Sequence, residues 1–181
     1  RRCGLPDKAI SSYKRSLKLD GRNVAALNNL GNTCHEQERL DEAKKYLNRA
    51  LDNDADFVPA QYNLALLLIK NKDMAAAEAQ LRLCIEKAPT VPNIWFTLAQ
   101  ILDAEDRIAE ATALLEDVVN NYCPDNTELC LKLIGFYQAV GRDREAAPLY
   151  KKVDQLDPSI AQGYVQQSMT FMNRLKQTDA Q

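Results

Sequence analysis

Apolar residues recur at three- and four-residue spacing along most of the chain, as in the stretch AAAEAQLRLCI. This spacing is typical of helices that bury one stripe of side chains. Helices of about 14 residues, joined alternately by a tight turn and a short connector, fit the pattern. We therefore expect an all-α chain of about ten helices with no strand.

The pattern returns after about 34 residues, which is the behaviour of a chain built from stacked units. The positions that recur are Leu30, Leu64 and Leu98, then Gly31, Ala65 and Ala99, then Ala43, Ala77 and Ala111, and then Leu47, Leu81 and Leu115. A further step, one residue longer, leads to Ala146 and Tyr150. Because a single helix pair cannot cover its own apolar stripe, the pairs are expected to stack into a solenoid.

The glycine at position 31 needs an explanation, since glycine inside a helix costs about 1 kcal/mol relative to alanine. Its counterparts Ala65 and Ala99 are also small, and the following helix supplies an alanine such as Ala43 in the same frame. We expect these small residues to let the two helices of one repeat approach closely.

The seven prolines indicate the same boundaries. Proline is tolerated at a helix start and stops a chain just past a helix end. On the repeat frame, Pro59 and Pro92 fall at helix starts, Pro89, Pro124 and Pro158 just past helix ends, Pro6 before a helix start, and Pro148 in a first turn whose amides have no partner.

The repeat resembles the tetratricopeptide repeat, which combines an aromatic residue, Leu-Gly, Tyr, Ala, a second aromatic residue, Ala and Pro. The residues in frame are Pro89, Trp95, Leu98, Ala99, Tyr137, Gly141, Ala146 and Tyr150. The departures are Cys34 in place of Tyr, Cys130 in place of an aromatic residue, Ala55 in place of Pro, and one extra residue near Cys123. The resemblance covers essentially the whole chain and implies a right-handed α-solenoid of antiparallel helix pairs.

On this frame residues 1–181 form a single array. Residues 1–23 are the second half of a repeat, full repeats span 24–57, 58–91, 92–126 and 127–160, and residues 161–176 form a terminal helix. Because repeat arrays need polar units at their ends, we expect this array to belong to something longer.

Charge and composition narrow the picture only slightly. A formal net charge of −2 gives no reason to expect nucleic acid or an anionic membrane as a partner. Cations prevail from Arg1 to Asn23 and acids from Asp103 to Glu128, and we interpret both runs as solvated helix faces. No apolar stretch is long enough to insert into a bilayer. Five cysteines without a pairing pattern indicate a reducing compartment, so a cytoplasmic protein is expected.

Candidate chemistry is sparse. The one histidine, His35, follows Cys34 on a predicted helix and has no companion for catalysis or metal binding. Cys123 and Cys130 lack the second pair of ligands that a zinc site needs, and no glycine-rich phosphate loop is present. We expect a non-enzymatic protein with no cofactor and no metal, whose function lies in its surface.

The resemblance implies that the first helix of each repeat lines a concave face, which holds an extended peptide or a partner helix. Projected onto this sequence, that face comprises Asn28, Asn29, Asn32, His35, Tyr62, Asn63, Leu66, Ile69, Asn93, Phe96, Thr97, Gln100, Leu131, Lys132 and Gln138. Asparagine amides can pair with a peptide backbone, and Tyr62, Leu66 and Phe96 offer an apolar patch. Alternatively, the asparagines are ordinary solvated surface residues.

One known sub-class of the family is excluded on charge. Tetratricopeptide domains that clamp the terminal carboxylates of heat-shock chaperones need two asparagines, which Asn32 and Asn63 supply, and three cations. Asn28, Asn93 and Thr97 stand where those cations are required, so carboxylates cannot be held there.

Three functional hypotheses follow. The first is a protein-interaction scaffold with no chemistry of its own. The second is the substrate-recruiting arm of a larger enzyme, because Asn29 and Asn63 resemble the asparagine ladder of O-linked N-acetylglucosamine transferases, although the ladder breaks at Thr97 and Lys132. The third, helical-repeat RNA binding, is disfavoured by the neutral face.

The two ends of the chain carry apolar rows that lack a cover. These rows are Val165, Met169 and Met172 at the C-terminal end, and Ile10, Tyr13 and Leu17 at the N-terminal end, where a first helix is missing. A further segment, a partner or a second copy is expected to cover them, and self-association through the array ends is one such arrangement.

Overall fold

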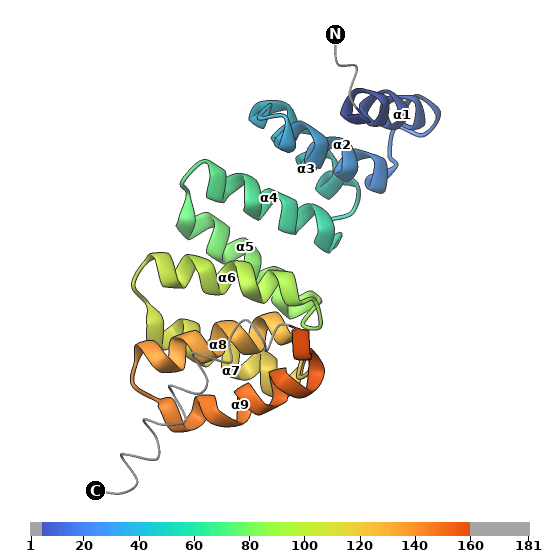
Figure 1. The fold of residues 1–181 in the computed structure, drawn as a ribbon. Helices are drawn as coiled ribbons and strands as arrows, with labels where there is room; N and C mark the ends of the chain where they lie inside the picture. The colour runs from blue at the N-terminus through green and yellow to red at the C-terminus, as the bar shows by residue number, and fades with distance from the viewer. Residues whose placement is uncertain (1–4, 160–181) are drawn as a thin grey trace, which may run out of the picture. The chain divides into compact units, whose positions relative to one another are not determined.

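The computed structural model describes residues 5–159, and within that range every regular element is an α-helix (Figure 1). The helices are α1 (Leu5–Leu19), α2 (Val24–Glu36), α3 (Leu40–Asn53), α4 (Val58–Lys70), α5 (Met74–Lys87), α6 (Pro92–Ala104), α7 (Ile108–Asn121), α8 (Thr127–Ala139) and α9 (Asp143–Leu156). The all-α prediction is confirmed for these residues. The helix predicted at 161–176 lies outside them.

The chain divides into two compact units, Arg1–Ala88 and Pro89–Gln181. In the first, α1 packs on α2, α2 on α3 and α4, and α4 on α3 and α5. In the second, α6 packs on α7, α7 on α8, and α8 on α9. Each unit is therefore a stack of helix pairs, while the repeat boundaries proposed from the sequence stay a prediction.

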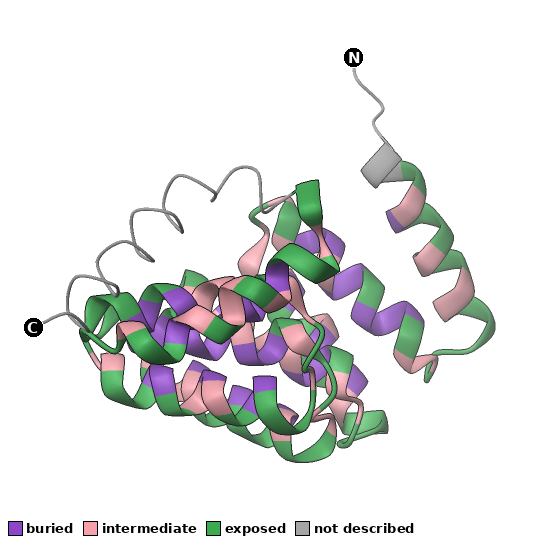
Figure 2. Ribbon diagram, turned by 60° about the horizontal axis from the view of Figure 1, so that its bottom comes forward, coloured by how far each residue is buried: buried purple, intermediate pink, exposed green. Residues whose placement is uncertain are grey.

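The two helices of each pair meet through small residues. Buried and exposed positions alternate along every helix, so that each presents one buried stripe to its neighbours (Figure 2). Ala43, Ala77, Ala111 and Ala146 are all fully buried. A Cβ atom added at Gly31 would lie 2.8 Å from Cγ of the buried Leu47. The close approach predicted for Gly31 is thus present.

Replacing Gly31 with alanine should therefore destabilise the protein by about 1–3 kcal/mol, because Leu47 has no room to move without straining the core. Gly135 provides the matched control, since no atom of residues 5–159 lies within 4 Å of a Cβ atom there and its helix position is exposed among them. Gly135→Ala should stabilise by up to about 1 kcal/mol through helix propensity alone. Urea denaturation of both variants measures the difference, and a neutral Gly31→Ala would contradict the tight contact.

The turn inside each pair uses one residue in the left-handed conformation. Glu38, Lys72, Asp106 and Gly141 have φ of 61°, 63°, 60° and 72°. The backbone N–H of this residue donates to the carbonyl oxygen three residues earlier. The N–H of the next residue donates to the carbonyl oxygen five residues earlier, as in Arg39 N to Cys34 O at 2.9 Å. This is the Schellman arrangement, which closes a helix and reverses the chain within a few residues.

Only Gly141 matches the glycine that this conformation favours. A residue with a Cβ atom costs roughly 1 kcal/mol or more there. Lys72→Gly should therefore raise the free energy of unfolding by up to about 1 kcal/mol, while Gly141→Ala should lower it by a similar amount. Thermal and urea unfolding of the two variants test the pair, and changes of the same sign in both would refute the explanation.

A second recurring feature is a backbone carbonyl in the connector before each pair. Three first helices carry a side chain that donates to the carbonyl six residues earlier, and in the remaining case an arginine of the following helix donates. The pairs are Gln61 to Ala55 O at 2.6 Å, Trp95 to Pro89 O at 2.8 Å, Cys130 to Pro124 O at 3.7 Å, and Arg49 to Gly21 O at 3.3 Å. In every connector, one backbone carbonyl that has no helical donor thus accepts a hydrogen bond from a side chain of a neighbouring helix.

Two of the proline predictions are wrong. Pro148 is the sixth residue of α9, beyond the first turn, because the reversal at Gly141 starts α9 at Asp143. Pro6 is the second residue of α1 and does not precede it. Pro59 and Pro92 do lie in the first turns of their helices, where the missing N–H has no helical acceptor.

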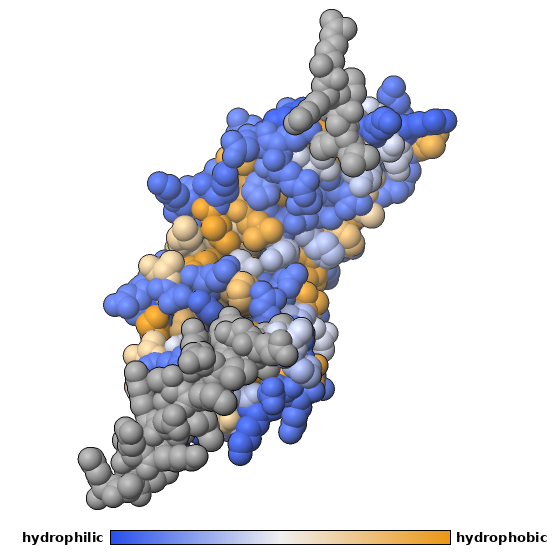
Figure 3. All heavy atoms as spheres, in the orientation of Figure 1, coloured by the Kyte–Doolittle hydropathy of each residue, from blue (hydrophilic) through white to orange (hydrophobic). Residues whose placement is uncertain are grey.

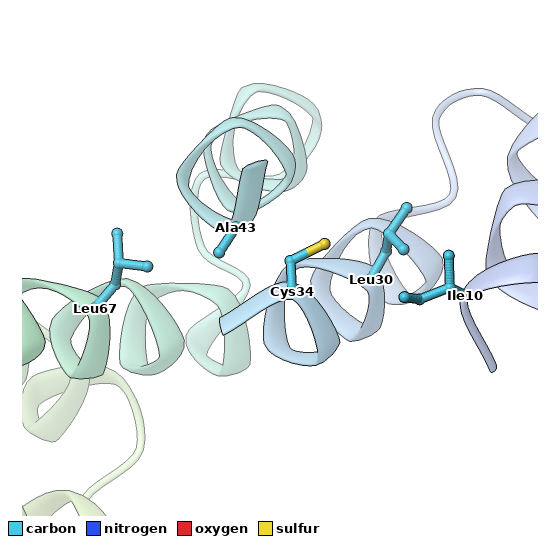
Figure 4. Packing of buried hydrophobic residues seen from close by; sticks show 5 residues of the cluster. All are labelled: Ile10, Leu30, Cys34, Ala43 and Leu67. Atoms are coloured by element: carbon cyan, nitrogen blue, oxygen red, sulfur yellow. The ribbon is translucent and has the colours of Figure 1, made fainter. Parts of the chain in front are cut away.

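The N-terminal apolar row is covered, contrary to expectation. Ile10 is 8% exposed and lies beside Leu30 in a buried cluster that continues through Cys34 and Ala43 to Leu67 (Figure 4). The half-buried side chains of Tyr13 and Leu17 also pack against this cluster. The row at Val165, Met169 and Met172 lies outside the described residues.

Candidate functional site

In the first unit, the predicted binding residues lie on two helices in contact, α2 and α4. Asn29 is exposed on α2, and Asn32, Tyr62, Asn63 and Leu66 are half-buried. Asn32 donates to Glu36 Oε1 at 3.0 Å, one turn further along α2. His35 and Ile69 are half-buried in the same two helices. The predicted residues thus follow one side of α2 and one side of α4, at spacings of about one helical turn.

Asn28 is not a surface residue but the centre of an amide network. It is 7% exposed, and its Oδ1 accepts from Asn63 Nδ2 at 2.8 Å across the two helices. Its own Nδ2 donates to Asn29 Oδ1 at 3.3 Å. Asn28 thus uses both ends of its amide on protein partners and orients the two more accessible asparagines.

An apolar strip accompanies these amides on α4. Tyr62, Leu66 and Ile69 are spaced by four and three residues, so they follow one side of the helix. Figure 3 shows apolar surface over the region of α4 and α5. The first unit therefore presents oriented amides beside partly exposed apolar side chains.

In the second unit, the predicted residues of α6 differ in exposure. Asn93 and Gln100 are exposed, Phe96 is half-buried, and Thr97 is 7% exposed. The hydroxyl of Thr97 donates to Asn93 O at 2.8 Å, four residues back. Thr97 is therefore directed to its own helix, and the accessible amide groups here are those of Asn93 and Gln100.

Lys132, on α8, is engaged by two neighbours. Its Nζ lies 2.7 Å from Asp103 Oδ2 on α6 and 4.8 Å from the centre of the Phe136 ring. Asp103 was not among the residues predicted from the sequence. The 34-residue repeat that relates His35 to Ile69 leads from Ile69 to Asp103. The ion pair keeps this face close to neutral. Leu131 is half-buried and Gln138 is exposed, with its Nε2 donating to Tyr150 Oη at 3.1 Å.

No group of three His, Cys, Asp or Glu side chains suited to a metal ion occurs in the part of the chain that the structure describes. Cys34, Cys84, Cys123 and Cys130 are unpaired thiols. Burial raises the pKa of Cys34, Cys123 and Cys130, and raises that of Cys84 to about 11. Since the thiolate is the reactive form, these cysteines are poor nucleophiles.

The buried thiol of Cys84 should make the folded protein less stable at alkaline pH. The pKa of Cys84 is about 11 in the folded state, compared with an ordinary value of 9.0. The free energy of unfolding is therefore unaffected by this thiol below pH 9 and decreases as the pH rises from 9 to 11. The loss amounts to roughly 2–3 kcal/mol. Urea unfolding between pH 8 and 11 should show a steeper decline for the wild type than for Cys84→Ala. Parallel declines would show that another group is responsible.

Comparison with known proteins shows a family match over the first half of the chain and a shared fold. A tetratricopeptide repeat model matches residues 4–68 and 36–89. A crystal structure of MamA has a TM-score of 0.70 at 23% identity, covering 87% of this chain and 91% of that one. MamA from Desulfovibrio magneticus RS-1 has a TM-score of 0.68 at 18% identity, covering 87% and 89%.

A third similar structure is YrrB, described as a TPR protein with an unusual peptide-binding site. Its TM-score is 0.65 at 16% identity, covering 81% of this chain and 75% of that one. No functionally curated protein matches the chain. The fold defines an all-α helical-repeat protein of the solenoid class, and residues 4–89 match the tetratricopeptide repeat family.

None of the helices among residues 5–159 is long and apolar enough to cross a bilayer.

Proposed function

We propose that this protein is a non-catalytic interaction module that binds a neutral, extended peptide segment on the face formed by α2 and α4. The amide network of Asn28, Asn29 and Asn63 carries the proposal. It holds Asn63 with its Oδ1 unused among the described residues, and Asn29 with its Nδ2 unused. One acceptor and one donor, held in place, match the pattern that a peptide backbone presents.

The apolar strip beside the network supplies the other half of the interaction. Leu66 lies one turn from Asn63, so a peptide that pairs with the amides can place an apolar side chain against Leu66 and Tyr62. A buried apolar anchor of this kind adds affinity and selects the side chain of the peptide, while the backbone pairs add affinity without selecting a sequence. The nearly neutral face disfavours a highly charged ligand. YrrB, a repeat protein of similar fold, has a peptide-binding site, which supports the same class of ligand here.

The other hypotheses gain less support. Neither the family match nor the similar structures point to a glycosyltransferase arm, so we do not propose one. RNA binding is disfavoured by the engagement of Lys132 with Asp103. The unpaired cysteines support a reducing, cytoplasmic compartment. Self-association through the array ends stays a prediction, and among the described residues the covered Ile10 argues against the N-terminal row as its interface.

The test begins with peptides selected from a random display library on the full chain. Their affinity is then measured by fluorescence anisotropy. Asn29→Ala combined with Asn63→Ala should weaken binding about 30-fold, because each lost backbone pair contributes about 1 kcal/mol. Leu66→Ser should also weaken binding, and the selected peptides should share an apolar position.

The matched control replaces Asn48 and Asn120 with alanine, since both are exposed asparagines on second helices. This variant should bind like the wild type. Asn28→Ala tests the positioning role, because Asn28 is nearly buried yet its loss should weaken binding by releasing Asn63. Equal affinity for all variants would remove this face from consideration. Circular dichroism confirms that each variant is folded.

A further inference from the structure

The outer face of α1 concentrates positive charge. Lys8, Arg15 and Lys18 are exposed on this helix, Lys14 is exposed at its edge, one turn from the buried Ile10, and Arg22 is exposed just after the helix. The opposite side of α1 packs into the core through Ile10 and its neighbours. In Figure 1, α1 lies at one end of the first unit, so its outer face points away from α2.

None of these five cations forms an ion pair with a described residue. Many cations of the other helices are matched with acids. The pairs include Lys132 with Asp103, Arg107 with Glu105 and Glu110, Arg142 with Glu116, and Lys152 with Asp125. The acidic run found in the sequence is thus largely neutralised within its own unit. The basic run is not, and α2, on which α1 packs, has no acidic residue before Glu36.

An exposed leucine stands among the cations. Leu19 is 86% exposed, the highest value among the exposed large apolar side chains. It follows Lys8 and Arg15 at spacings of eleven and four residues, which places all three on one side of the helix. A lone apolar side chain flanked by Lys18 and Arg22 has no partner in the described residues.

We propose that the outer face of α1 docks onto an anionic lipid bilayer, with the cations at the headgroups and Leu19 entering the interface. Clusters of four or more Lys and Arg side chains bind such surfaces, and each contributes about fivefold to the affinity. A flat bilayer reaches Lys8, Arg15 and Leu19 together, since they share one side of a helix. An acidic protein partner would use the cations but would give the protruding Leu19 no comparable apolar layer.

The experiment is co-sedimentation of the full chain with vesicles. Phosphatidylcholine vesicles containing about 30% phosphatidylserine should bind the protein at low salt, whereas pure phosphatidylcholine should not. Raising the salt should weaken binding strongly, because exposed charges are screened. Lys8→Gln with Arg15→Gln and Lys18→Gln should reduce binding about 100-fold, and Leu19→Ser should reduce it several-fold without changing the salt dependence.

The control variant removes the same charge elsewhere, through Lys44→Gln, Lys45→Gln and Lys151→Gln on α3 and α9, where these lysines are exposed. It should bind vesicles like the wild type. Equal losses in both triple variants would reduce the effect to net charge and overturn the proposal. Failure to bind anionic vesicles, or tighter binding to polyglutamate that is insensitive to Leu19→Ser, would overturn it in favour of solvation or an acidic protein partner. The peptide test on α2 and α4 is independent of these outcomes.

Discussion

The contact of one alanine with the facing helix sets the geometry of each pair. Ala43, Ala77, Ala111 and Ala146 are fully buried, and each lies near the start of the second helix of its pair. Because an alanine keeps the two helices close at this point, the chain must reverse within a few residues. The left-handed residue in each turn provides that reversal, even where the residue is Glu38, Lys72 or Asp106 and carries a conformational cost.

The connectors between pairs show the same physical requirement met by different chemistry. A carbonyl just before each first helix lies beyond the reach of helical hydrogen bonds and needs a donor from a side chain or from water. An amide from Gln61, an indole from Trp95, a thiol from Cys130 and a guanidinium from Arg49 each serve this acceptor. The fold thus needs a donor at this place and does not need one residue type. This explains how repeats with Leu27, Gln61 and Trp95 at one position can share a backbone.

Most of the fold could be predicted from periodicity, because each buried stripe must recur wherever a helix meets its neighbours. The close approach of the two helices at Gly31 followed from the same reasoning, although the nearest atoms there belong to Leu47 and not to Ala43. Pro148 could not be placed, since its helix starts where the turn at Gly141 ends, and a proline in the interior contradicts the local preference that the prediction used. The helix at this place in the repeat therefore forms despite the proline inside it.

The candidate site was less accessible to sequence reasoning. The repeat frame predicts a face, but it could not separate Asn28 from its neighbour Asn29, because the two differ by one position and only one is buried. Nor could it reveal that Lys132 is held by Asp103, since that depends on side-chain reach between two helices. Such pairings depend on rotamers and helix spacing, which periodicity does not encode.

The amide network makes the proposed peptide face a property of two repeats together. Asn63 on α4 is oriented by Asn28 on α2, so the spacing of these helices decides where its free oxygen points. That spacing in turn depends on a core that includes Ile10 from α1 and Leu67 from α4. The cluster that holds α1 in place is therefore the same cluster that fixes the positions of Asn28 and Asn63. A substitution that loosens this cluster, such as Ile10→Ala, would therefore disturb the spacing of α2 and α4 as well as the seating of α1, because packed cores transmit strain.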